Sequence, residues 1–172
     1  MSLKVISPEV LLAEGPVSCL GRNDIERVKA MALASPKRRA RICAHPDNDD
    51  TLHEMLIVTA KGAYFQPHKH LGKSESFHMI EGRLSVVFFD DEGAVSDTVH
   101  LGGSEDDRSF YYRLSAPLFH TVITETDLAV FHETTNGPFQ PEDTVYAPWA
   151  PSEKDSEEIT KGYLNKALAA PV

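Results

Sequence analysis

The stretch GAYFQPHKHLGKSESFHMIEG, residues 62–82, decides the fold and the candidate site. Within it, His68 and His70 are two residues apart, which puts both imidazoles on the same face of a β-strand. Glu75 follows a turn at residues 71–74, so its carboxylate can join them from the next strand. Two imidazoles and a carboxylate on one face predict a metal site with nitrogen and oxygen ligands.

A fourth ligand is expected from a distant strand, because a barrel brings the inward-facing residues of opposite hairpins together. His120, within APLFHTVIT, is the predicted fourth ligand, although a single histidine after a proline-containing turn can also be purely structural. The sequence therefore predicts one divalent ion on four side chains: His68, His70, Glu75 and His120. Iron, manganese, nickel and zinc all accept such a mixed set, so the metal stays open.

The surrounding sequence, between Leu52 and Thr135, breaks into short runs rich in β-branched and aromatic residues. Turn residues such as Glu81-Gly82 separate them, a rhythm typical of a β-sandwich or barrel. No helical pattern of about 12 residues intervenes, so parallel βαβ units are not expected. The predicted strands are LHEMLIVT, AYFQPH, SFHMIEGRLSVVFF, VSDTVHL, FYYRL, HTVIT and LAVFHETT.

Helices are predicted on both sides of these strands. In NDIERVKAMALAS, Asn23 can act as the cap and Glu26 occupies the capping-box position. The basic run at residues 36–41 then reads as an exposed connector. Ser156 can cap a last helix, whose predicted packing face consists of Ile159, Tyr163, Leu164, Ala167 and Leu168.

The chain is expected to divide into three parts. Residues 1–44 carry the first helix and the basic connector, residues 45–139 form the barrel, and residues 140–172 form a proline-rich tail with a helix packed on the barrel. A length of 172 residues suits one such domain with its own core.

Composition narrows the partners and the compartment. The chain carries 17 Lys plus Arg against 26 Asp plus Glu, a formal charge of −9, which argues against a nucleic acid partner. Two cysteines, Cys19 and Cys43, cannot form a disulfide framework and are typical of a reducing compartment. No apolar run approaches the roughly 18 residues of a membrane span. We expect a cytoplasmic protein without membrane association.

The spacing around the histidines resembles the first motif of the cupin superfamily: Gly, five residues, His-x-His, three or four residues, Glu, six residues, Gly. Every position is filled here, by Gly62, His68, His70, Glu75 and Gly82. The second cupin motif is matched less well, since Pro117 and His120 are present at a shorter separation and Thr124 replaces its Asn. The resemblance implies an all-β cupin double-stranded β-helix, or jelly-roll barrel, with the predicted N- and C-terminal helices flanking it.

A closer resemblance, over about residues 36–151, is to cupin metalloproteins of the WbuC type, often encoded among surface-polysaccharide biosynthesis genes. It is carried by Arg39, Arg41 and His45 and by PHKHLGKSESFHMIEGRLSVVFFDDEG, FHTVI, FHETTNGPF and YAPWAP. The resemblance implies a metal-binding jelly roll linked to sugar metabolism.

Four further residues are candidates for substrate binding. Gln66 and Tyr64 share the expected face of His68, although Tyr64 could equally be barrel packing. Arg41 and His45 are candidates from the resemblance, with a solvated basic connector as the alternative for Arg41. Glu133 is a candidate general acid or base, and the competing interpretation is a solvated carboxylate on an edge strand.

Three functions are compatible with such a site. The first is a metal-dependent enzyme, with isomerase-like, epimerase-like or hydrolytic chemistry on a sugar or other small oxygen-rich substrate in surface-polysaccharide biosynthesis. The second is a non-catalytic module that binds a carbohydrate or small acid. The third is an Fe(II) dioxygenase. Several cupins pair barrels through exposed strands, so a homodimer is a further expectation.

Overall fold

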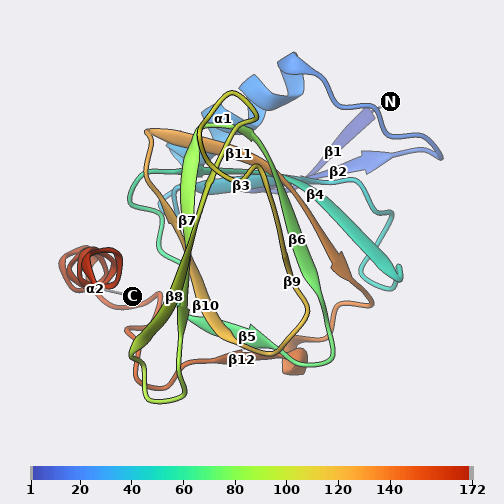
Figure 1. Ribbon diagram of the computed structural model, residues 1–172. Coiled ribbons are helices and arrows are strands. Elements are labelled where there is room, and N and C mark those ends of the chain that lie inside the picture. Colours follow the sequence, from blue (N-terminus) through green and yellow to red (C-terminus); the bar gives the residue numbers. More distant parts are fainter. Residues whose placement is uncertain (1, 171–172) are drawn as a thin grey trace.

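The computed structural model describes residues 2–170, which form two β-sheets and two α-helices. The seven-stranded sheet has the order β1 (Ser2–Ser7), β2 (Val10–Glu14), β3 (Arg39–Cys43), β4 (Leu52–Ala60), β11 (Leu128–Asn136), β6 (Glu75–Glu81), β9 (Tyr111–Leu114). The five-stranded sheet has the order β12 (Thr144–Tyr146), β5 (His68–His70), β10 (Phe119–Thr124), β7 (Arg83–Phe89), β8 (Val95–Gly102). In Figure 1 these strands surround the middle of the molecule as a barrel. The fold is therefore the predicted all-β barrel with a helix on either side.

Strand alternation decides which side chains face the barrel interior. Along β6, Glu75, Phe77 and Met79 are buried while His78 between them is exposed, which confirms that His78 points away from the site. Phe77 packs against Phe131 of β11, with ring centroids 4.8 Å apart, in the main core cluster. The same cluster contains Phe88, whose ring centroid lies 6.2 Å from that of His120, so the core extends to the histidines.

One predicted strand does not form. Residues 63–67, within the predicted run AYFQPH, lie outside the sheets, and β5 starts only at His68. Pro67 has no N–H to donate to a ladder, so pairing begins after it. The alternation expected for Tyr64 and Gln66 therefore does not apply.

The basic run also differs from its prediction. Residues 36–41 were expected to form a connector, but Arg39 begins strand β3, which pairs with β2 and β4. Its alternate residues Ala40 and Ile42 are buried, while the arginines lie on the other face. Residues 1–44 thus contribute three strands to the larger sheet in addition to their helix.

The first helix, α1 (Arg22–Ala34), lies against the outer face of the larger sheet, as Figure 1 shows. Val28 and Ala32 are its buried residues, and they pack in one cluster with Ile42 of β3 and Val58 of β4. The helix starts differently from the expected Asn23 cap, because Gly21 is the N-cap and its N–H donates to Asp24 Oδ2 at 2.8 Å. Its end before Pro36 is as predicted.

The second helix, α2 (Glu157–Ala169), covers the outer face of the smaller sheet. Ser156 is its N-cap, as predicted, and accepts a hydrogen bond from the Ile159 N–H at 3.4 Å. Its buried side is rotated from the expected face: Thr160, Leu164 and Ala167 are buried, whereas Ile159 is 53% exposed. No helix within residues 2–170 has the length and apolar character needed to cross a membrane.

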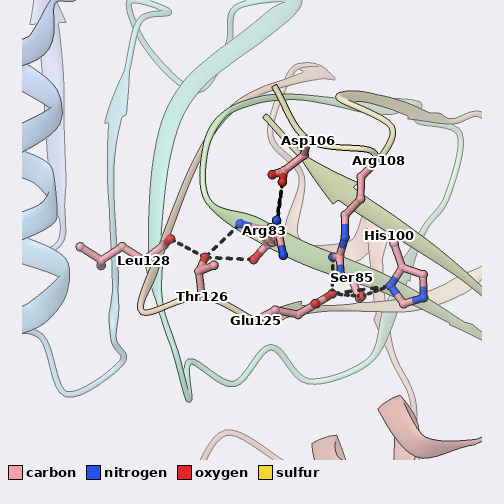
Figure 2. Close-up of polar contacts among 8 residues, drawn as sticks. All are labelled: Arg83, Ser85, His100, Asp106, Arg108, Glu125, Thr126 and Leu128. Carbon is pink, nitrogen blue, oxygen red and sulfur yellow. Dashed lines mark hydrogen bonds and ion pairs between the residues drawn. The ribbon is translucent and has the colours of Figure 1, made fainter. Parts of the chain in front are cut away.

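A polar network joins the end of β10 to strands β7 and β8 (Figure 2). Glu125 lies at its centre and accepts hydrogen bonds from Ser85 Oγ at 2.5 Å and from Arg108 Nη1 at 2.9 Å. Ser85 Oγ also lies 2.7 Å from His100 Nδ1. Although serine, histidine and glutamate meet here, Ser85 is fully buried, so the network is structural rather than a nucleophilic site. Burial alone would raise the pKa of Glu125, but hydrogen bonds from Arg108 and Ser85 hold it below its ordinary value.

Replacing Glu125 by glutamine is expected to lower the free energy of unfolding by about 1 kcal/mol near neutral pH, since a partly screened charge-assisted bond is lost. The folded-state pKa of Glu125 is lowered, so its stabilisation exists above the unfolded-state pKa and disappears as the pH falls through the folded-state pKa. Urea unfolding should show the two proteins converging below about pH 4. A difference that is the same at both pH values would show that the charge of Glu125 is not its source.

Candidate metal centre

Three histidines from two neighbouring strands of the smaller sheet meet at one point. His68 and His70 lie two residues apart on β5, and His120 on β10 is the register partner of His68. One ligand nitrogen from each of the three lies within 4.8 Å of the others, close enough to share an ion. The structure thus brings His70 and His120, 50 positions apart in the chain, to one place, but through the pairing of neighbouring strands β5 and β10 in one sheet rather than through opposite hairpins of the barrel as expected.

Glu75 reaches the same point from the larger sheet. One carboxylate oxygen lies 3.1 Å from His120 Nε2 and the other 3.5 Å from His70 Nε2. The Tyr112 hydroxyl on β9 donates to Glu75 Oε1 at 3.2 Å, which fixes the orientation of this buried carboxylate. The carboxylate is therefore buried and adjacent to His70 and His120, whereas the ligand atoms that all lie within 4.8 Å of one another are those of the three histidines.

The far nitrogen of each imidazole has its own partner. His68 Nδ1 donates to the Gln66 carbonyl at 2.8 Å and His120 Nδ1 donates to the Leu118 carbonyl at 3.0 Å. His70 Nδ1 lies 3.3 Å from Thr144 Oγ1. A proton held at Nδ1 leaves the Nε2 lone pair available, and a hydrogen bond from the other ring nitrogen is usual for a metal-binding histidine. The residues present therefore fit a divalent metal ion.

Burial and charge set the protonation of the cluster. Burial, helped by the neighbouring His120, lowers the pKa of His68 to about 4, so this imidazole is neutral at physiological pH, as a ligand must be. Burial alone would raise the pKa of Glu75, but the facing His120 imidazole holds it well below its ordinary range. Burial alone would likewise lower the pKa of His120, and Glu75 raises it overall. Glu75 is thus a carboxylate ready to accept a cation.

A cavity of about 320 Å³ opens beside this cluster, and its far wall comes from the inner face of the larger sheet. Glu133 on β11 lines this wall, where its strand neighbours on either side are Met55 and Phe77. Burial, reinforced by the charge of Glu75, raises the pKa of the Glu133 carboxyl to about 8. No hydrogen bond or ion pair to Glu133 occurs within residues 2–170.

The expectation that Glu133 is a solvated edge-strand carboxylate is wrong, because β11 lies between β4 and β6 in the sheet. The sequence did contain evidence for this position. Phe131, Glu133 and Thr135 are two residues apart on β11 and therefore share one face of the strand. Applied to this strand, the period-two argument used for Glu75 would have placed Glu133 in the cavity.

Two of the four substrate-binding candidates line this cavity. The Arg41 side chain lines this cavity, as Glu133 does. His45 lies at the same cavity, stacked on His53 with ring centroids 4.1 Å apart, and its Nδ1 accepts a hydrogen bond from the Glu54 N–H at 3.2 Å. Burial lowers the pKa of His45, so it faces the cavity as a neutral ring.

The other two candidates lie elsewhere. Gln66 lines a second, outer cavity, where its Nε2 donates to the Ala147 carbonyl at 3.4 Å. Tyr64 lines neither cavity: its hydroxyl donates to the Pro151 carbonyl at 2.5 Å and its ring packs with the cluster beneath α2. The packing interpretation of Tyr64 is therefore the one that the structure supports.

Comparison with known proteins supports the fold. The family described as a domain of unknown function, DUF6016, matches residues 20–101. No curated protein matches the sequence. The capsular polysaccharide assembling protein CapF from Staphylococcus aureus superposes with a TM-score of 0.50 at 17% identity, over 63% of this chain and 31% of that one. Protein SO0799 from Shewanella oneidensis also gives a TM-score of 0.50, at 13% identity, over 75% of this chain and 81% of that one.

Oxalate decarboxylase from Bacillus subtilis is a more distant match, with a TM-score of 0.45 at 20% identity over 57% of this chain and 24% of that one. CapF is a cupin-fold protein, and the chain described here adopts the same cupin fold. The matched region spans less than a third of CapF. The histidine cluster in such a barrel fits a metal-binding cupin.

Proposed function

We propose that the protein is a metal-dependent enzyme acting on a small, oxygen-rich substrate, with His68, His70, Glu75 and His120 holding one divalent ion. The observation that carries the proposal is that the three imidazoles line an open cavity of about 320 Å³. Structural metal sites are closed by protein ligands, whereas reactive sites keep positions for water or substrate. Three imidazoles and one carboxylate would leave such positions on a six-coordinate ion.

The chemistry follows from what each group can supply. A divalent ion held there would polarise a carbonyl or hydroxyl group, which suits isomerisation, epimerisation or hydrolysis. Glu133 faces the same cavity and can hold or release a proton at its carboxyl oxygen. Phe77 and Phe131 contribute apolar wall, which limits the water that reaches the reacting group.

The substrate is proposed to carry a negative charge as well as hydroxyl groups. The Arg41 guanidinium forms no ion pair within residues 2–170, and its charge lowers the pKa of Glu133 against the larger effect of burial, so Arg41 is the cation on this wall that an anionic group can contact. His45, neutral and at the same cavity, can hydrogen-bond a hydroxyl. CapF assembles capsular polysaccharide, and the WbuC-type resemblance points the same way, so a sugar acid in surface-polysaccharide synthesis is the proposed substrate class.

The proposal is tested by incubating the metal-loaded chain with panels of keto-sugars, sugar acids and nucleotide-sugars, and following products by mass spectrometry and NMR. We expect turnover that is removed by chelation, restored by the metal and absent in His68→Ala. Binding of the same compounds without any product would support a non-catalytic binding module instead. Oxygen uptake with Fe(II) that fails with Zn(II) would support a dioxygenase and overturn the proposal.

A further inference from the structure

A second cavity, of about 420 Å³, adjoins the first on its outer side. The two share part of their walls, so they lie next to each other at these side chains. The residues that line both are Arg41, Met55, Ile57, Phe65, His68 and Glu133. One of them, His68, is a proposed metal ligand, so the outer cavity lies directly beside the proposed metal centre.

The charges on the outer wall balance: Lys37 and Arg39 share the carboxylate of Glu153, and the second carboxylate, Glu9, accepts hydrogen bonds from the Ser7 and Ser35 hydroxyls. Arg39 Nη2 pairs with Glu153 at 2.7 Å and its guanidinium lies over the Phe65 ring at 4.5 Å, while Lys37 Nζ is 3.6 Å from Glu153. Arg41, at the junction of the two cavities, forms no ion pair among the described residues; Glu133, which lines both cavities with it, is a nearby charge rather than a bonded partner. The outer cavity therefore suits a neutral polar group, and the junction suits an anionic one.

Tyr146 gives the outer cavity an aromatic surface. It lies on β12 as the register partner of His68, and the two ring centroids are 6.0 Å apart. It lines the outer cavity and is 57% exposed. An open tyrosine face with hydrogen-bonding groups around it can hold the apolar face of a sugar ring.

We infer that the ligand is an acidic saccharide of two units: the metal and Arg41 bind its acid-bearing unit, and Tyr146 holds a neutral second ring in the outer cavity. This inference rests on the proposed metal function and adds the size and the charge pattern of the substrate. It makes Tyr146 a specificity-determining residue, which contacts the neutral second ring of the saccharide and takes no part in metal binding.

The test measures binding of three probes to the Zn²⁺-loaded chain by calorimetry: lactobionate, which joins galactose to an aldonic acid; gluconate, the acid alone; and lactose, the neutral disaccharide. We expect lactobionate to bind about two- to tenfold more tightly than gluconate, as stacking on one tyrosine allows, and lactose to bind most weakly. Tyr146→Ala should remove the advantage of lactobionate and leave the affinities for gluconate and Zn²⁺ unchanged. Arg41→Gln should weaken both acids.

The matched control is Tyr111→Ala, which removes another exposed tyrosine, on strand β9, that lines neither cavity. It should change none of the affinities. If gluconate binds in a Zn²⁺-dependent way but lactobionate binds no better, the inference is overturned and the metal function stands. If none of the probes binds the loaded chain, the inference is overturned; if Zn²⁺ does not bind, the metal function fails with it.

Discussion

Replacing His120 by alanine is expected to lower the affinity for a divalent ion at least about 100-fold, because loss of a ligand should cost no less than loss of a second-shell partner. His120 is the residue that joins the two sides of the site. Its Nε2 lies 3.1 Å from Glu75 Oε1, and its strand position is paired with His68. Competition with a fluorescent zinc chelator measures the change directly.

The control for this variant is His78→Ala. His78 belongs to strand β6, which also carries Glu75, but it is exposed on the opposite face, so its removal should leave metal affinity unchanged. His120 is only 1% exposed, and a folding defect is therefore checked with His70→Ala, whose side chain is 23% exposed. Unchanged affinity in folded His120→Ala and His70→Ala would contradict the site described here.

Replacing Gly82 by alanine is expected to destabilise the protein by roughly 2–5 kcal/mol, the combined cost of left-handed backbone and of overpacking. Gly82 has a φ of +74°, in the tight turn from β6 to β7. An added Cβ would also meet the Leu128 carbonyl oxygen and lie 2.7 Å from Thr126 Oγ1. Figure 2 shows Thr126, which accepts a hydrogen bond from the Arg83 N–H at 2.9 Å and donates to the Leu128 carbonyl at 2.7 Å.

Two control glycines separate these costs in urea unfolding experiments. Gly72 also has a positive φ, +67°, but nothing lies within 4 Å of an added Cβ, so Gly72→Ala should cost only about 1–2 kcal/mol. Gly162, inside α2, has open space and helical backbone, so Gly162→Ala should be neutral or stabilising by up to about 1 kcal/mol. Equal losses for Gly82→Ala and Gly72→Ala would show that the contacts with Leu128 and Thr126 are unimportant.

The barrel could be predicted because its signals are local. A two-residue period in 75–79, turn residues at Gly82 and the absence of long helical patterns all lie within short windows of sequence. Strand β3 was not predicted because it depends on partners far along the chain: Arg39 pairs with Thr59, and Arg41 with Ile57. Strands β1 and β2, which extend the sheet beyond β3, were not predicted either. A short basic run carries no local sign that both of its neighbours will be strands.

The candidate site was predictable to the extent that its residues share one strand or one motif. His68, His70 and Glu75 follow from spacing, whereas His120 lies beside them because β10 pairs with β5, a pairing that the argument from opposite hairpins did not predict. Tyr64 was misplaced because Pro67 delays the start of β5, which removes the alternation that the prediction used. Tyr146 could not have been found this way, because a three-residue strand in a proline-rich tail has too little pattern to show which strand it joins.

The most direct test of the account is an anomalous difference map from crystals of the protein loaded with Zn²⁺. The account predicts one strong peak at about 2.0–2.2 Å from nitrogen atoms of His68, His70 and His120 and from a Glu75 oxygen. The peak should lie on the side that faces the cavity of about 320 Å³. A map with no peak among these four side chains, or with the bound ion held by other residues, would contradict it.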